Sequence, residues 1–409
     1  MSGWQETDFG RIPKEWGLKK VADIKSEDKR AIAMGPFGSN IKAENFIEHG
    51  IPVIRGTNLN FAKYVGGDFV YLTDEKADDL LGSNCKAGDL VFTHRGTIGQ
   101  VGLIPTGKFP RYVISQSGMK LTVNSDLMDS DFLFYFFKSE FGQYQILKYE
   151  SQVGVPSISN PLTSLKEIKV PVPPPLEQKA IATVLSSLDD KIDLLHRQNQ
   201  TLEAMAATLF RQWFVEEARE GWEERPLSRI ANFLNGLACQ KHPPKSELEK
   251  LPVLKIRELS GGISESSDWA TSEIKPEYIV DAGDVIFAWS ASLMVKMWDG
   301  ERCVLNQHLF KVTSTEFPKW FYLMWCKHHL AEFISISSSH ATTMGHIKRG
   351  DLDTAMVNVP SPNELKSMSE QMTPLLDKQI ANAKQLRLLE NLRDTLLPKL
   401  MSGEVRVVY

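Results

Sequence analysis

Two stretches of this chain repeat one another in the same order. The first runs from Trp16 to Phe214 and the second from Trp222 to Leu400. WGLKKVADI in the first copy corresponds to WEERPLSRI in the second, KAGDLVFTHRG to DAGDVIFAWSA, and SQSGMKLTV to NQHLFKVTS. The offset falls from 206 residues at the tryptophans to 187 near the ends of the copies. Solenoid units are only about 20–50 residues long, so this period predicts a duplicated domain and two pseudo-symmetric lobes.

The composition is that of a globular protein with two domains. The 409 residues, 42% of them apolar, supply enough chain for two cores. No apolar run reaches the roughly 20 residues of a membrane-spanning helix. The start, MSGWQETDFG, has neither the basic nor the apolar segment of a secretion signal, so we expect a cytoplasmic protein. Scattered cysteines without ligand-like spacing predict free thiols: Cys85, Cys239, Cys303 and Cys326.

The charge balance argues against non-specific nucleic-acid binding. The formal net charge is −4; residues 1–175 carry 20 basic and 20 acidic side chains, and residues 216–363 carry 16 and 20. A protein that holds DNA only by neutralising phosphates needs a basic excess. If DNA is the ligand, basic groups must gather on one face or a partner must share the contact.

Each repeat reads as a mixed α/β lobe followed by a helical arm. Short β-rich runs such as IPVI, DLVF and MKLTV are separated by turn residues, and aromatic-rich helices are predicted at 131–149 and 317–336. The proline-rich joints VPVPPP and VPSPN end the lobes, because proline fixes φ and removes a backbone donor. The expected fold is mixed α+β, with two globular lobes joined by two long antiparallel, coiled-coil-like helices. The predicted boundaries are 1–175 for the first lobe, 176–215 for its arm, 216–362 for the second lobe and 363–409 for its arm.

The arms carry apolar residues in alternating steps of four and three, which is a heptad pattern. We expect these stripes to pair with one another; the alternative is that each packs only on its own lobe. Asn199 would face the partner helix, where a buried Asn costs stability but fixes register. The pairing positions are Leu188, Ile192, Leu195, Asn199, Leu202, Ala206, Leu209 and Trp213 in the first arm, and Leu376, Ile380, Ala383, Leu386, Leu389, Leu392, Leu396 and Leu400 in the second.

Both arms also carry a break signal at equivalent positions. Ser187 and Asp190 form a possible capping box, and Pro374 stands 187 residues after Ser187. Proline is tolerated in a first helical turn but not in a helix interior. The pattern predicts short helices near 177–186 and 364–372, followed by long helices of about 26 residues, or roughly 40 Å, that begin near 188 and 375.

The search for catalytic motifs is negative. The chain has no phosphate-binding GxxxxGK[ST] loop, no HExxH, no GxSxG and no zinc-spaced Cys/His cluster. We therefore predict no catalytic residues, no metal ligands and no cofactor for this chain.

Polar turns recur at matched places in both copies, while their tips differ: THRGT in one and AWSAS in the other. Arg suits guanine, Asn or Gln suits adenine, and Ser or Thr suits either base in the major groove. Polar turns occur in every domain, so the set carries more weight than any member. The candidate DNA-binding residues are Arg55, Asn58, His94, Arg95, Thr97, Gln116, Gln152 and Ser157 in the first copy, and Lys255, Arg257, Trp289, Ser290, Gln307, His308, Thr343, His346, Lys348 and Arg349 in the second.

Four segments carry a family resemblance: GDLVFTHRGTIGQVG, VPVPPPLEQKAIATVLSSLDDKID, TTMGHIKRGDL and LLPKLMSGEV. With these segments the chain resembles, over essentially its whole length, the specificity subunit of type I restriction–modification systems. The second copy departs from the family pattern, since AWSAS replaces the usual basic, glycine-containing turn.

The resemblance implies two target-recognition domains, each binding one half of an asymmetric bipartite DNA site, with the two helices as a ruler. It implies two methyltransferase subunits, which bring S-adenosylmethionine and modify adenine, and motor/nuclease subunits, which use ATP and Mg. The duplication agrees with this on separate grounds, because two lobes about a pseudo-dyad suit half-sites about one helical turn, ~34–36 Å, apart.

Other hypotheses stay open at this point. A related phage-exclusion system that methylates without classical restriction would use a similar subunit, and only the neighbouring genes would distinguish it. A coiled-coil scaffold whose lobes bind protein would show no sequence-specific DNA binding. An unrecognised nuclease lacks any carboxylate–lysine constellation in the sequence.

Overall fold

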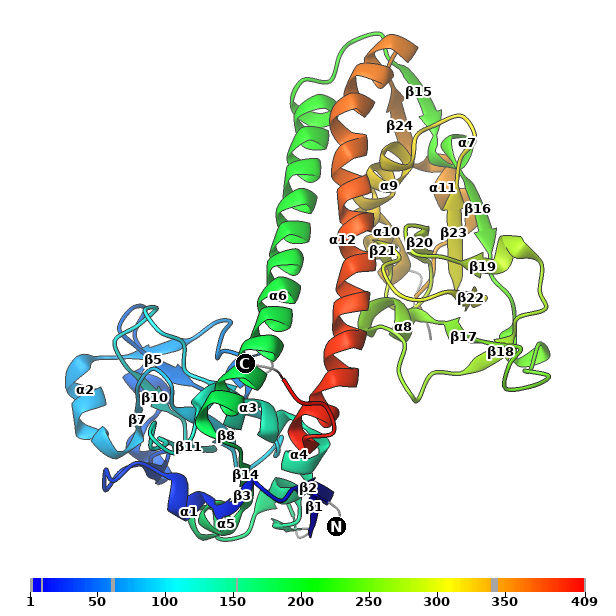
Figure 1. Cartoon of the computed structure of the whole chain (residues 1–409). Helices are drawn as coiled ribbons and strands as arrows, with labels where there is room; N and C mark the ends of the chain where they lie inside the picture. Colours follow the sequence, from blue (N-terminus) through cyan, green and yellow to red (C-terminus); the bar gives the residue numbers. More distant parts are fainter. Residues whose placement is uncertain (1–2, 9, 60–62, 152–153, 340–344, 408–409) are drawn as a thin grey trace. The chain divides into compact units, whose positions relative to one another are not determined.

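The structure, a computed structural model, describes residues 3–8, 10–59, 63–151, 154–339 and 345–407 (Figure 1). The chain forms two compact units: Met1–Asp193 with Leu389–Tyr409, and Leu194–Leu388. Each unit therefore contains one lobe together with part of both long helices.

The first unit has its strands in small sheets around a helical core. One four-stranded sheet has the order β6-β5-β10-β7, a second has β4-β11-β8-β9, and β14 pairs with β3. The strands are β1 Trp4–Thr7, β2 Gly10–Pro13, β3 Gly17–Lys20, β4 Ile32–Met34, β5 Ile51–Ile54, β6 Val70–Leu72, β7 Asn84–Cys85, β8 Leu90–Thr93, β9 Val101–Leu103, β10 Tyr112–Ile114, β11 Gly118–Leu121, β12 Glu150–Ser151, β13 Ser157–Ile158 and β14 Lys169–Val172. The helices of this lobe are α1 Val21–Ile24, α2 Asp74–Asp79, α3 Ser130–Lys138, α4 Glu140–Leu147 and α5 Pro161–Glu167.

The second unit repeats the two four-stranded sheets and the β14–β3 pair of the first, and its described residues form no counterparts of the pairs β1–β2 and β12–β13. Its sheets have the orders β18-β17-β22-β19 and β16-β23-β20-β21, and β15 pairs with β24. The strands are β15 Glu223–Pro226, β16 Asn232–Asn235, β17 Lys250–Leu254, β18 Trp269–Thr271, β19 Ile279–Val280, β20 Val285–Ala288, β21 Met294–Met297, β22 Cys303–Leu305, β23 Leu309–Thr313 and β24 Met356–Val359. The helices are α7 Leu227–Ile230, α8 Ile256–Gly261, α9 Lys319–His328, α10 Leu330–Ser339 and α11 Arg349–Thr354.

The two lobes share one fold, as the internal repeat predicts. The parallel pair β5–β10 corresponds to β17–β22, and each pair lies at the same place in its sheet. One ion pair also repeats: Lys120 reaches Asp89 in the first lobe (4.0 Å), where the pair is buried, and Lys311 reaches Asp284 in the second (2.8 Å), where it is half-buried. Both carboxylates come from the GD pair of the repeated KAGD/DAGD motif. The repeated motif is therefore framework, which fixes the sheet beneath the loops.

Each predicted aromatic helix is buried but consists of two helices. Positions 132–137 of α3 are all buried, and α9 is buried over 320–326. The first break occurs at Ser139, whose backbone is extended and whose hydroxyl caps α4 by accepting from Gly142 N. The second occurs at His329, between α9 and α10. A local cap at Ser139 thus ends what the apolar pattern alone reads as one helix.

The arms are continuous, and the predicted break in each is wrong. Helix α6 spans Pro175–Arg211 and α12 spans Pro362–Ser402, as the unbroken ribbons in Figure 1 show. The Ser187 hydroxyl donates to Thr183 O one turn earlier instead of capping a new helix. Pro374 costs an interior helix about 3 kcal/mol. Met372 and Leu376 on either side are buried in the second unit, and each buried side chain stabilises by about 1.5–3 kcal/mol, which offsets the proline.

The two long helices run antiparallel and pair within each unit. In the second unit, Asn382 Nδ2 donates to Asn199 Oδ1 (2.9 Å), and Gln379 Nε2 donates to Asn199 O (3.3 Å). In the first unit, Arg393 Nη1 donates to Asp189 Oδ1 (3.2 Å). These contacts confirm that the arms pair and that Asn199 faces the other helix.

Most predicted pairing positions lie on the inner face of the arms. The buried ones are Ile192, Leu195, Ala206, Leu376, Ala383, Leu386 and Leu400, and the half-buried ones are Leu188, Asn199, Leu202, Leu209, Trp213, Ile380, Leu389 and Leu396. Leu392 is the exception: it is 43% exposed, and the neighbouring Arg393 turns inward.

Toward the ends of the arms the stripe also packs on the lobes, so both predicted uses of it occur. Leu209 and Trp213 pack on the core of the second unit, where Phe210 and Phe214 are buried more deeply.

The four cysteines are buried free thiols, as predicted. Burial raises the pKa of Cys85, Cys303 and Cys326, which keeps these thiols protonated. Within the described residues, no helix is long and apolar enough to cross a membrane.

Candidate nucleic-acid interface

The candidate residues of the first copy come together at one edge of the lobe. The parallel strands β5 and β10 end at this edge, and Ser115 N donates to Ile54 O (2.8 Å) across their ends. His94 N donates to Ser117 O (2.9 Å), and Ile158 N donates to His94 O (2.8 Å). We call these joined segments the first loop cluster: residues 55–58, 94–100, 115–117 and 156–158.

The first loop cluster is basic, although the lobe as a whole is neutral. Its segments RGTN, HRGTIGQ, SQS and PSI contain two arginines and no carboxylate. Arg55, Arg95, Thr97 and Gln116 are exposed. Neither guanidinium has an ion-pair partner among the residues that the structure describes. This edge therefore provides the local basic face that the net charge alone does not reveal.

Two candidates of the first copy hold the loops instead of projecting from them. Asn58 is 1% exposed; its Oδ1 accepts from Arg55 N, and its Nδ2 donates to Gly66 O and Asp68 O. His94 is buried, with Nε2 3.1 Å from Gln116 O, and this burial lowers its pKa. A side chain whose polar atoms are already bonded inside the protein has none left for a base edge. We correct both from candidate readers to loop supports.

Two candidates of the first copy remain, Ser157 and Gln152. Ser157 is half-buried and lies beside Arg95 through a β-bridge. Gln152 lies outside the described residues.

The second copy forms an equivalent edge with different chemistry. Asn306 N donates to Leu254 O (3.1 Å), which corresponds to the Ser115 contact of the first copy. A bridge joins Ser290 to His346, as one joins Arg95 to Ser157. We call residues 255–257, 289–293, 306–308 and 345–347 the second loop cluster.

At the second loop cluster a half-buried indole and two exposed imidazoles stand where the first has guanidinium groups. The rings of Trp289 and His308 lie 6.1 Å apart, and those of Trp289 and His346 lie 6.3 Å apart. The Trp289 Nε1 donates to Asn235 Oδ1 (3.0 Å). Ser290 is buried, with its Oγ 3.2 Å from His308 Nδ1, and therefore supports the histidine. Gln307 is half-buried and His308 and His346 are exposed.

The lysine and arginine after β17 are engaged within the protein. Lys255 is ion-paired with Asp268. Arg257 pairs with the buried Glu258 (2.6 Å) and donates to Ser266 O (2.8 Å). Their charge is thus largely matched, in contrast to Arg55 and Arg95.

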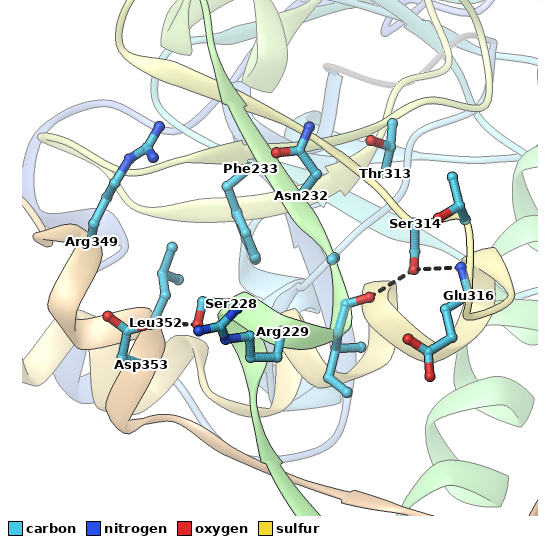
Figure 2. Close-up of a pocket in the computed structure, with 13 residues that line it drawn as sticks. Ser228, Arg229, Asn232, Phe233, Thr313, Ser314, Glu316, Arg349, Leu352 and Asp353 are labelled. Atoms are coloured by element: carbon cyan, nitrogen blue, oxygen red, sulfur yellow. Dashed lines mark hydrogen bonds between the residues drawn. The ribbon is translucent and has the colours of Figure 1, made fainter.

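Arg349 lies apart from the second loop cluster, in a polar pocket at the opposite end of β16 and β23. Figure 2 shows its side chain on α11, together with Arg229 and Ser228 on α7 and with Asn232 and Thr313. The pocket also contains Glu316 and Asp353, and Asp353 accepts from Ser228 Oγ. Lys348, the residue before α11, is exposed. Thr343 lies outside the described residues.

Two contacts that the sequence reading missed join the arms to the lobes. Trp16 Nε1 donates to Glu177 Oε2 (3.1 Å), and Arg406 Nη2 donates to the same oxygen (2.9 Å). In the second unit Trp222 Nε1 donates to Glu364 Oε2 (3.2 Å), and Arg219 pairs with Glu364 Oε1 (2.6 Å).

These two Trp–Glu–Arg clasps are repeat-equivalent, because Arg406 follows Arg219 by the same 187 residues that separate Glu364 from Glu177. Each clasp joins the arm end of one repeat to the lobe of the other. The tryptophans that begin each repeat were the available signal for them.

The described residues contain no group of three or more His, Cys, Asp or Glu that could hold a metal ion. The exposed groups of the loop clusters are donors, aromatic rings and hydroxyls, which suit binding rather than bond cleavage.

Comparison with known proteins decides what kind of domain this is. The family model described as the type I restriction modification DNA specificity domain matches residues 37–204 and again residues 219–391. The chain belongs to this family. Each match covers most of one lobe and part of its arm, so the specificity domain is present twice, as the internal repeat predicts.

Relatives match the specificity-domain chain over nearly its full length. The type I restriction enzyme MjaIX specificity subunit of Methanocaldococcus jannaschii is 27% identical, covering 99% of this chain and 96% of the relative. The HindI specificity subunit of Haemophilus influenzae is 20% identical, covering 92% and 100%. The crystal structure of a type I S subunit from M. genitalium matches with a TM-score of 0.61 at 17% identity, covering 94% and 96%. At 17% identity this structural similarity supports the fold alone.

Proposed function

We propose that this chain is the DNA-specificity subunit of a type I restriction–modification complex, in which each lobe reads one half of a bipartite DNA site. The observation that carries the proposal is the pair of loop clusters: the same strand ends present them, and their exposed chemistry differs. Arg55 and Arg95 suit guanine or phosphate, whereas Trp289 and His308 present aromatic and imidazole edges. Two similar frames with different tips would read two different half-sites.

The paired helices would set the distance between the half-sites. Helix α6 has 37 residues and α12 has 41, and they run antiparallel with polar contacts at fixed positions. A heptad inserted into each arm beside Asn199 and Asn382 preserves the apolar seam and adds about 10 Å of helix. With ~3.4 Å per base pair, the recognised spacer should lengthen by about three base pairs. An unchanged spacer would mean that the arms do not measure distance.

The chain itself is non-catalytic, as a specificity-domain protein. We propose that methyltransferase subunits supply S-adenosylmethionine and that motor/nuclease subunits use ATP and Mg²⁺. Shared binding would also account for the near-neutral lobes, because the partners would neutralise part of the phosphate charge.

The test exchanges one lobe at a time in the assembled methyltransferase. Residues 1–175 are replaced by the same region of a relative with a different site, and the methylated sites are mapped across a genome. We expect one half of the recognised sequence to change while the other half and the spacer stay the same. Exchange of residues 216–362 is the matched control and should change only the other half. Methylated sites that change in both halves, or in neither, would refute one reader per lobe.

A further inference from the structure

The large apolar side chain of Phe37 stands exposed next to the first loop cluster, where Val155 is also exposed. Phe37 is 69% exposed, and its ring makes no aromatic contact with another described residue. Full burial of a phenylalanine stabilises a fold by about 1.5–3 kcal/mol relative to exposure. The lobe forgoes this stabilisation at Phe37, so packing does not explain the residue.

The loop that carries Phe37 is held against the reading edge from both sides. Strand β4 pairs antiparallel with β11, so β4 ends beside the point where the 115–117 turn leads into β11, and Gly35 N donates to Gly118 O (2.9 Å). A Cβ on Gly35 would collide with the Ser115 carbonyl, and Gly38 has φ +60°. The first position excludes any side chain, and the second lies in the left-handed region that favours glycine. The loop therefore presents Phe37 in a defined place at the rim of the first loop cluster.

The ring is not needed to form this loop. In the second lobe Gly236 lies equally close to the carbonyl of Asn306, so it corresponds to Gly35. Two residues further on stands Ala238, where the first lobe has Phe37. The frame forms with a methyl group in one copy and a benzyl group in the other. The difference thus belongs to the variable tips.

An apolar ring on the loop that borders the 115–117 turn, at a lobe edge that also carries exposed Arg55, Arg95 and Gln116, matches one feature of the major groove. The 5-methyl of thymine is the apolar group displayed there, beside the acceptors and donors that Arg and Gln recognise. No carboxylate in the cluster opposes the approach of DNA. A protein partner would also cover an exposed ring, but the surrounding cations and amides favour a nucleic-acid edge.

We propose that Phe37 is a specificity-determining residue that contacts a thymine methyl group in the half-site read by the first unit. The proposal rests on the proposed function and names one base contact within it. Loss of the contact leaves the methyl group in water, which weakens binding by about fourfold for one methyl.

The experiment deletes the methyl group from the DNA and the ring from the protein. The assembled methyltransferase with its specificity subunit binds duplexes in which each thymine of the mapped first half-site is replaced in turn by uracil. We expect about a fourfold loss at one thymine with the natural subunit. Phe37→Ala should weaken binding to thymine DNA and abolish that response to uracil. Phe37→Leu, which keeps an apolar tip, should restore part of it.

Leu176→Ala is the matched control, because Leu176 is an exposed apolar residue of the same unit on α6, outside the first loop cluster. It should leave the uracil response unchanged. The proposal is overturned if no thymine responds, if Phe37→Ala keeps the same response, or if Phe37→Ala only prevents assembly with the methyltransferase. Failure of the lobe exchange to change one half-site would instead overturn the proposed function, whatever the uracil result.

Discussion

Arg393→Leu should destabilise the first unit more than any surface substitution of similar size. The Asp189 carboxylate of α6 is 6% exposed, and it accepts from Tyr135 Oη (2.8 Å) and from Arg393 Nη1 (3.2 Å). Leucine at position 393 removes the positive charge and leaves Asp189 buried with one hydrogen bond. Burial, and then the nearby Asp189 charge, raise the pKa of Tyr135, so its hydroxyl stays a donor.

The magnitude follows from a stranded buried charge. Removal of one partner of a buried ion pair costs about 3–5 kcal/mol. Arg393 is 26% exposed. Burial, and then the nearby charge of Arg393, lower the pKa of Lys138, which lies close enough to Asp189 to replace part of the lost attraction. We therefore expect the lower end, about 3 kcal/mol. For a unit of this size that is a fall in Tm of roughly 6–12 °C.

Thermal unfolding of the full chain, with hydrogen exchange of peptides from α3 and the end of α12, measures the effect within the first unit. Asp189→Asn combined with Arg393→Leu should recover most of the loss, because the neutral amide still accepts from Tyr135. Arg387→Leu on the exposed face of the same helix is the control and should stay within about 0.5 kcal/mol of the natural chain. A mild effect of Arg393→Leu, or no recovery in the double variant, would refute the buried-charge account.

Three further substitutions test other contacts. Asn199→Leu should cost about 1–3 kcal/mol, because the buried Asn382 amide loses its closer acceptor and keeps only the 3.4 Å contact with Gln198 Oε1. Asn199→Leu with Asn382→Leu should regain that loss in urea unfolding. Arg406→Ala should lower the thermal stability more than its counterpart Arg219→Ala, because the clasped carboxylate is fully buried in the first unit and partly exposed in the second. Burial lowers the pKa of His94, so its contribution to stability is complete above the usual value of about 6.5 and is lost as the pH falls below it. His94→Gln should flatten the pH dependence of unfolding below about pH 6.5, and an unchanged slope would show that another group titrates there.

The duplication made most of the fold predictable from the sequence. Lobe order, the long antiparallel arms and the inward position of Asn199 follow from repeated motifs and a heptad stripe. The break at Ser187 and Pro374 did not occur, because local helix signals compete with burial of Met372 and Leu376, which only the folded lobe supplies. The sequence did not predict the role of Arg393 for a similar reason. The heptad pattern assigns the pairing position to Leu392, but in the structure Arg393 faces the other helix and bonds the buried Asp189 carboxylate.

The loop clusters were predictable as regions but not residue by residue. Polar residues after strand ends gather at one edge whenever the strands are arranged as here, so Arg95 and Trp289 were found. Whether such a side chain projects into solvent or holds the loops together depends on backbone groups that are distant in the sequence. The Asn58 side chain donates to the carbonyls of Gly66 and Asp68, and no sequence pattern around position 58 predicts those partners.

The separation between frame and tip explains how such a protein can change what it reads. The Lys–Asp pairs, the close glycines and the strand-end hydrogen bonds recur in both lobes. The groups at the same edge differ: exposed arginines and a phenylalanine in one copy, and a half-buried tryptophan with exposed histidines in the other. Exposed tips contribute little to folding, since surface substitutions usually change stability by no more than about 0.5 kcal/mol. A base contact contributes about 1–3 kcal/mol to discrimination. Under the proposed function, substitution at a tip would therefore change recognition more than stability, and the duplicated frame would let one half-site change while the other is kept.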